Sequence, residues 1–212
     1  NVILGRAEFL QRKTKDPATA KGLQTIIDQV ERITRIMNQL LTFARRRPIE
    51  RRPMNLNKVV EETLDMMWER FKRHRIEVVT ELSPSLPQAD ADPVQISQVM
   101  LNLAMNALHA IGDDGTLSVR TAVVPVKSQT SNHSTDMIEL SVSDTGHGIA
   151  SEDLDKIFNP FFTTKEVGKG TGLGLTVVHG IIQEHGGHIK VESEVQKGTT
   201  FRILFPIISL RS

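Results

Sequence analysis

The sequence has no cysteine, almost no net charge and no long apolar run. Without cysteine, neither a disulfide framework nor a thiolate metal site can form. The formal net charge of +1 gives no sign of a polyanionic partner, so we expect no nucleic acid to bind. No run approaches the ~18–20 apolar residues of a membrane-spanning helix, and no signal peptide is visible. We therefore expect a cytoplasmic protein, with a membrane tether only if a segment upstream of Asn1 supplies it.

The first 47 residues carry helical patterns and no strand pattern. Asp16 and Pro17 separate two helical segments. In the second segment, apolar residues recur at alternating steps of three and four, as in a coiled-coil seam. These positions are Leu23, Ile26, Val30, Ile33, Met37, Leu40 and Ala44. Ile27, Ile36 and Leu41 make the apolar stripe of this helix wider than one partner helix could cover. Residues 1–47 are therefore predicted to form a hairpin that dimerises into a four-helix bundle. The alternative is a hairpin packed on the second domain.

The pattern changes after a polar, basic stretch, residues 48–53, which is predicted to be a linker. Residues 54–212 alternate between helix and strand patterns. Helices are expected near 55–74, 92–111 and after residue 174. Strands are expected at 76–82, 115–124, 137–144, 188–193 and 199–207, and a polar hairpin loop at 125–136. Alternating strands imply a sheet with one buried face, so the fold class is α+β, with three helices on one face of an antiparallel-type sheet.

The helix at 92–111 contains Asn102 and Asn106, which share one face, followed by His109. Asparagine has poor helix propensity, so two in register need a reason. An amide oxygen is a hard, neutral ligand that suits Mg²⁺ held together with phosphates and water. On spacing alone, two exposed asparagines remain an equal alternative.

Two glycine-rich segments follow. In "VSDTGHGI", Asp144 ends a strand and precedes two glycines. A carboxylate only accepts hydrogen bonds, so it would select adenine, whose amino group donates where guanine has a carbonyl. A plain Asx turn in a hairpin is the alternative for this motif alone. The second segment, "GKGTGLGL", is not a P-loop, since no Lys-Ser or Lys-Thr follows its glycines, and it lacks the strand and third glycine of a dinucleotide fingerprint. Before it, "IFNPFFTTK" places aromatic side chains on a loop, as in a lid. A small satellite core beneath a loop is an equal alternative for these side chains taken alone.

Five blocks occur in one order: "NLAMNALHA", "VSDTGHGI", "IFNPFFTTK", "GTGLGL" and "KGTTF". Together they resemble the catalytic and ATP-binding region of bacterial sensor histidine kinases, of the nitrogen-regulation type, within the Bergerat-fold ATPases. The resemblance covers essentially the whole chain. It implies a two-layer Bergerat sandwich at 54–212, Mg-ATP as ligand, a homodimer, phosphorylation of a histidine and onward transfer to an aspartate of a response regulator.

The resemblance also implies residue roles. Asn106 would ligate Mg²⁺, Asn102 would lie beside the triphosphate, and His109 occupies a position where many relatives carry lysine or arginine. Asp144 would bind the adenine amino group, helped by Thr199. The adenine pocket would also contain Gly146, Gly148 and Ile149. A lid would run from Phe158 to Gly170, with Phe161 and Phe162 as anchors and Lys165 near its start. The backbone at the phosphates would come from Gly170, Thr171, Gly172, Leu173, Gly174 and Leu175.

One position separates a kinase from a hydrolase within this group. Hydrolytic relatives carry glutamate where Asn102 stands, and glutamate serves as the general base for water. A hydrolytic ATPase of the chaperone or mismatch-repair class and a non-catalytic nucleotide-sensing dimer remain alternatives. None of the seven histidines lies in the hairpin. We expect the acceptor histidine upstream of Asn1, and expect this chain to bind ATP without phosphorylating itself.

Overall fold

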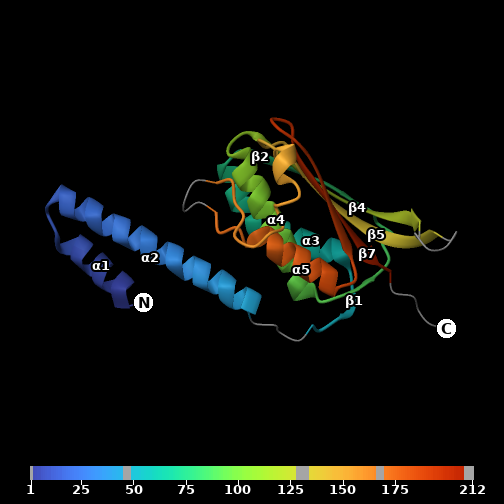
Figure 1. The fold of residues 1–212 in the computed structure, drawn as a ribbon, viewed down its shortest axis with the longest axis horizontal. Coiled ribbons are helices and arrows are strands. Elements are labelled where there is room, and N and C mark those ends of the chain that lie inside the picture. Colours follow the sequence, from blue (N-terminus) through green and yellow to red (C-terminus); the bar gives the residue numbers. More distant parts are fainter. Residues whose placement is uncertain (1, 45–48, 128–133, 166–169, 208–212) are drawn as a thin grey trace.

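The computed structural model describes residues 2–44, 49–127, 134–165 and 170–207, without the side chains of 31–33, 35–44 and 127. The first two helices, α1 (Val2–Lys13) and α2 (Pro17–Ala44), form the predicted hairpin (Figure 1). Asp16 begins α2 because its carboxylate accepts the backbone N–H groups of Ala18 and Thr19. Ala7 and Ile27 are buried where the two helices meet. Part of the predicted seam, from Ile33 onward, has side chains outside the described set.

A five-stranded sheet forms the centre of the second part of the chain. Its strands are β2 (Ile76–Leu82), β4 (Gly115–Lys127), β5 (Ser134–Asp144), β6 (His188–Glu194) and β7 (Gly198–Pro206), in the order β2-β4-β5-β7-β6. The β2–β4 pair is parallel and the other pairs are antiparallel. The expectation of an antiparallel-type sheet is thus corrected to a mixed sheet. Residues 125–127 and 134–136 lie in strands rather than in the predicted loop, and 128–133 fall outside the described residues.

Three helices cover one face of this sheet: α3 (Leu56–Arg73), α4 (Pro93–Ile111) and α5 (Gly174–Glu184) (Figure 1). Asn55 caps α3 by accepting the Lys58 N–H, and Asp92 caps α4 with Pro93 in the first turn. The apolar faces of the helices meet the buried face of the sheet in one core, which includes Phe71, Ile96, Leu140, Ile182 and Phe205. The predicted α+β sandwich is confirmed. No helix among the described residues is long and apolar enough to cross a bilayer.

Sequence patterns missed a small second sheet. Strand β1 (Arg52–Met54) pairs antiparallel with β3 (Ala89–Ala91). Arg52 and Pro53 therefore belong to a strand that packs with the α+β part, although they fall in the predicted linker. The division of the chain into domains otherwise stays a prediction.

The chain enters the α+β part at a hydrogen-bonded junction. The carboxylate of Asp92 accepts the backbone N–H of Glu50, while Arg51 donates to the carbonyl of Glu184 at the end of α5. His185, which is 1% exposed, accepts the Asp92 N–H at Nε2 (3.0 Å) and donates from Nδ1 to the Ile181 carbonyl (2.7 Å). The start of α4, the end of α5 and the incoming chain are thereby held together.

Candidate functional site

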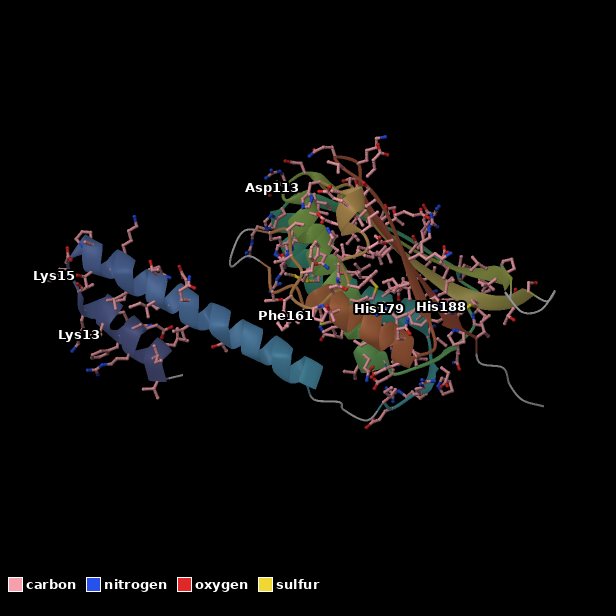
Figure 2. The ribbon with its side chains drawn as sticks, in the orientation of Figure 1. Lys13, Lys15, Asp113, Phe161, His179 and His188 are labelled. Carbon is pink, nitrogen blue, oxygen red and sulfur yellow. The ribbon has the colours of Figure 1, made fainter. Side chains whose placement is uncertain are left out.

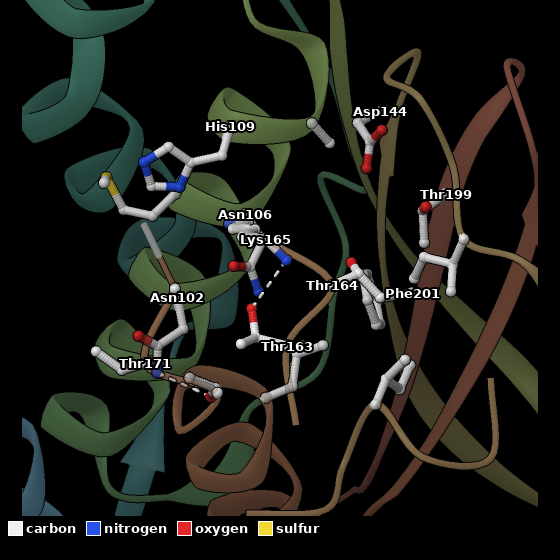
Figure 3. A pocket seen from close by; sticks show the side chains of 18 of the residues that line it. Asn102, Asn106, His109, Asp144, Thr163, Thr164, Lys165, Thr171, Thr199 and Phe201 are labelled. Atoms are coloured by element: carbon white, nitrogen blue, oxygen red, sulfur yellow. Dashed lines mark hydrogen bonds between the residues drawn. The ribbon is translucent and has the colours of Figure 1, made fainter. Parts of the chain in front are cut away.

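A cavity among the described residues has a volume of about 650 Å³, which is within the usual range for small-ligand sites. It lies between α4, the ends of β5 and β7, and the segment that leads into α5. Figure 3 shows Asn102, Asn106 and His109 projecting from α4, with Asp144 and Thr199 on the opposite side. The cavity thus joins residues that lie about a hundred positions apart in the sequence.

The two asparagines of α4 differ in their surroundings. The Asn102 side chain donates from Nδ2 to the Gly174 carbonyl and accepts from Gln98 Nε2, both at 3.3 Å, so it links α4 to the first residue of α5. Asn106, one turn later, is half-buried and lines the cavity, but its side chain forms no hydrogen bond with any described residue. A half-buried amide without a protein partner leaves its oxygen available to a ligand in the cavity.

At the opposite end of the cavity, Asp144 terminates β5. Ile138, Leu140 and Val142 face the core at every second position, and Asp144 continues that face beyond them. Its carboxylate accepts the Gly146 N–H at 2.8 Å, and its cross-strand neighbour is Thr199 on β7. Burial raises the pKa of the Asp144 carboxyl above its ordinary value of 3.8, against the opposing effect of backbone hydrogen bonds from Gly146 and Thr199.

Two positions in the cavity wall admit only glycine. Gly148 has φ +70° and Gly172 has φ +65°. A Cβ atom at Gly148 would overlap the Glu194 carbonyl, and one at Gly172 would overlap the backbone of Phe161. Gly172 also accepts the Phe161 N–H at 3.0 Å. The glycine segment is therefore packed directly onto the start of the predicted lid.

The predicted lid is described at both its ends, while residues 166–169 fall outside the described set. Phe162 packs partly against the core, as expected of an anchor. Phe161 does not: its side chain is 66% exposed at the edge of the α+β part (Figure 2). Its backbone, which has φ +67°, is the part that packs on Gly172, and this leaves the ring on the outer side. Phe161 holds the lid through its N–H bond to Gly172, and Phe158 adds a ring contact with His179 at 5.1 Å.

Lys165 lies further along the lid, with its side chain half-buried in the cavity. Burial lowers the pKa of its ammonium group. A buried cation gains an electrostatic partner when an anion enters the cavity, since each offsets the other's loss of water.

Most of the predicted site residues come together in the cavity wall. Three do not line it: Gly146 packs against Ala110, Phe161 points outward, and Leu173 is buried in the core before α5. Thr163 and Thr164, which belong to the predicted lid, and His147, which belongs to the predicted adenine turn, also line it, although none was named as a site residue. Residues outside every predicted site segment line it as well: Arg70, Gln98, Leu101, Met105, Ala110, Ile157 and Phe201. Helical spacing around Asn102 could have found Gln98 and Met105, but not Arg70, which lies on another helix.

The charges along the cavity are separated. Asp144 is the one carboxylate among the described lining residues, and it is bound to the Gly146 N–H at one end. Arg70, His109 and Lys165 provide basic groups away from Asp144, while His147 lies near the Asp144 carboxylate. No described carboxylate lies beside Asn102 and Asn106, so the region of the two amides can bind anions but contains no described carboxylate base.

Comparisons with known proteins agree with this geometry. Residues 91–209 match the family described as histidine kinase-, DNA gyrase B- and HSP90-like ATPase, and residues 1–49 match the His Kinase A (phospho-acceptor) domain. Sensor histidine kinase ZraS of Salmonella typhimurium strain LT2 is 35% identical over 98% of this chain and 42% of its own length. Sensor kinase CckA of Brucella abortus strain 2308 is 41% identical over 92% of this chain and 21% of its own length.

A solved structure of histidine kinase ThkA in complex with response regulator protein TrrA superposes with a TM-score of 0.72, at 26% identity, over 99% of this chain and 58% of that one. The chain spans less than half the length of ZraS and of CckA, the two curated relatives named above. The family match covers more than half of this chain, and the phospho-acceptor match precedes it, with residues 50–90 between the two. The chain belongs to the histidine kinase-, DNA gyrase B- and HSP90-like ATPase family, as a member of its sensor histidine kinases.

Proposed function

We propose that this chain is the ATP-binding kinase core of a two-component sensor, which transfers the terminal phosphoryl group of ATP to a histidine and then to a response-regulator aspartate. The observation that carries the proposal is the cavity's polarity: one carboxylate at one end, and two amides with basic groups toward the other. The ThkA structure, a relative solved with a response regulator, supports the second partner.

ATP fits the cavity in one orientation. Its adenine amino group would donate to Asp144, beside Thr199, because Asp144 is the described lining group that can only accept a hydrogen bond while ionised. The phosphates would then reach Asn102, Asn106, Lys165 and the start of α5. The first turn of that helix begins at Gly174 and carries unpaired backbone N–H groups suited to phosphate oxygens.

Magnesium fits Asn106 rather than a carboxylate cluster. No group of three or more histidine, aspartate or glutamate side chains among the described residues could hold a metal ion. The Asn106 amide, without a described protein partner, can offer its oxygen as one ligand while phosphates and water complete the shell. When bound there, magnesium would neutralise charge on the phosphates.

The transfer reaction requires position and charge neutralisation from this chain. The bond between the terminal phosphorus and the oxygen of ADP breaks as a phosphorus–nitrogen bond to an imidazole forms. That bond breaks in turn when the phosphoryl group passes to an aspartate oxygen. Asn102 orients the chain of phosphates through its link to Gly174, and Lys165 neutralises their charge.

The hydrolytic alternative is disfavoured by Asn102. An amide cannot take a proton from water at neutral pH, and the described lining carboxylate, Asp144, lies at the adenine end. Bound ATP is therefore retained for transfer rather than spent on water.

The test measures ATP binding and steady ATP hydrolysis by the same chain. We expect saturable binding with hydrolysis near the uncatalysed background, and no acid-labile label from γ-labelled ATP, because residues 1–49 contain no histidine. Steady phosphate release that falls sharply in Asn102→Ala would instead support a hydrolytic ATPase. Transfer is tested by replacing residues 1–49 with the phospho-acceptor hairpin of a relative. Acid-labile label should appear there and disappear in Asp144→Asn.

A further inference from the structure

The cavity has a basic lining group that comes from outside the family blocks of the sequence. His109 and Lys165 lie on α4 and the lid, which carry those blocks, but Arg70 comes from the last turn of α3. Two other basic residues of that turn, Lys72 and Arg73, do not line the cavity. A favourable interaction with the helix dipole accounts for all three equally, so it does not explain why Arg70 alone of them faces the cavity.

Arg70 is held in place by its helix. Its neighbours Met67 and Phe71 are 2% and 0% exposed in the core, which fixes the backbone of this turn. Its Nη1 atom lies 3.2 Å from the sulfur of Met105, a neutral and weak hydrogen-bond acceptor. Arg70 forms no ion pair with any described carboxylate. A guanidinium group in this setting has most of its donors available to an anion.

The contact with Met105 places Arg70 along the cavity. Met105 immediately precedes Asn106, and lies one turn from both Asn102 and His109 on α4. Arg70 therefore reaches the cavity level with the amides, away from the Asp144 end. Its side chain is exposed, so it lies at the opening rather than in the interior. The terminal phosphate must face that opening, because a protein acceptor has to reach it.

We propose that Arg70 binds the terminal phosphate of ATP from the α3 side, and so makes the cavity prefer ATP over ADP. The proposal rests on the proposed function of the cavity. The planar guanidinium can donate two parallel hydrogen bonds to one phosphate, which a thioether cannot match as a partner. When ATP binds, Arg70 exchanges its contact with Met105 for this charged pair.

The experiment titrates the 212-residue chain and its variants with ATP and with ADP in the presence of magnesium. Arg70→Ala is expected to weaken ATP about 10- to 100-fold, the range for a hydrogen bond to a charged group, and ADP less than about threefold. Arg70→Lys should restore part of the ATP affinity, since it keeps the charge but loses the fork. The matched control is Arg73→Ala, an exposed arginine of the same turn outside the cavity, which should leave both affinities unchanged.

The outcomes separate this proposal from the proposed function. If the unmodified chain binds no ATP, the nucleotide-site assignment fails and the proposal falls with it. If the unmodified chain binds ATP but Arg70→Ala matches Arg73→Ala, only the role of Arg70 is overturned. Equal losses for ATP and ADP overturn the assignment to the terminal phosphate. Thermal unfolding of each nucleotide-free variant checks that the exposed substitution leaves the fold intact.

Discussion

Asp144 carries both a cost in stability and a role in binding, and a single substitution separates the two. In Asp144→Asn the new side chain can still accept the Gly146 N–H, but it no longer has a carboxylate to desolvate. We expect the nucleotide-free protein to be as stable as before or more stable, by up to about 1 kcal/mol. ATP affinity should fall about 100-fold, because an amide N–H would face the adenine amino group. Thermal unfolding and nucleotide titration measure the two effects.

Titration of the Asp144 carboxyl should also make the stability of the folded protein depend on pH. The pKa of the folded carboxyl lies above its unfolded value, so the unfolded chain releases this proton first as the pH rises. The contribution of Asp144 to stability is therefore complete below the unfolded pKa, about 4, and is lost as the pH rises through the folded pKa. The unmodified protein should lose stability relative to Asp144→Asn across that interval. Parallel pH profiles for the two proteins would contradict the assignment.

At the scale of single residues, the sequence allowed prediction of those site residues that local spacing along a helix or strand reveals. Asn102 and Asn106 share a helix face and Asp144 ends an alternating strand, so both features were predicted and both line the cavity. Phe161 was predicted as a lid anchor, but its ring is exposed and only its backbone packs on Gly172. Arg70 was missed because only the packing of α3 against α4 brings it to the cavity, and no local pattern records that packing.

Among the elements, the glycine segment before α5 allows a matched pair of alanine substitutions. Gly172→Ala places a side chain at φ +65° and into the Phe161 backbone, so the turn must move. We expect this change to cost at least about 1–3 kcal/mol locally and to weaken ATP binding by about tenfold or more. Gly180→Ala, in the interior of α5 where an added Cβ meets no atom within 4 Å, should stabilise by about 0.5–1 kcal/mol.

Chemical unfolding and ATP titration of both variants provide the measurement. If Gly172→Ala bound ATP as tightly as Gly180→Ala, the close packing of the glycine segment on the lid would have no role in binding.

The small sheet of β1 and β3 shows which elements the sequence could not predict. Its strands have three residues each, and one contains Pro53, so neither length nor alternation marked them.

At the scale of the whole molecule, the hairpin of α1 and α2 leaves part of its apolar surface uncovered in a single chain. Apolar side chains of α1 and α2 stay exposed, namely Val2, Ile3, Phe9, Leu10 and Ile26. We expect a dimer that covers them, in line with the predicted four-helix bundle. Ile26→Lys should weaken dimerisation more than about tenfold, because it places a charge on an apolar interface without disturbing the hairpin core. Sedimentation equilibrium measures the association.

Thr25→Lys is the matched control, since Thr25 is exposed and lies beside the predicted seam rather than in it. A monomeric unmodified chain, or equal effects of the two lysine substitutions on dimerisation, would refute the interface.

The fold class of the whole molecule was predictable because its helices and strands carry strong periodicity in their apolar residues. The parallel β2–β4 pair was not, since strand periodicity is the same for either direction of pairing.

The junction residue His185 has a consequence for phosphoryl chemistry. An imidazole accepts a phosphoryl group only through a nitrogen with a free lone pair. In His185 the Nε2 lone pair is occupied by the Asp92 N–H, Nδ1 carries its proton to the Ile181 carbonyl, and the ring is 1% exposed. This imidazole is therefore chemically protected. A protein proposed to make phosphohistidine keeps a histidine in its own core without offering it as a substrate.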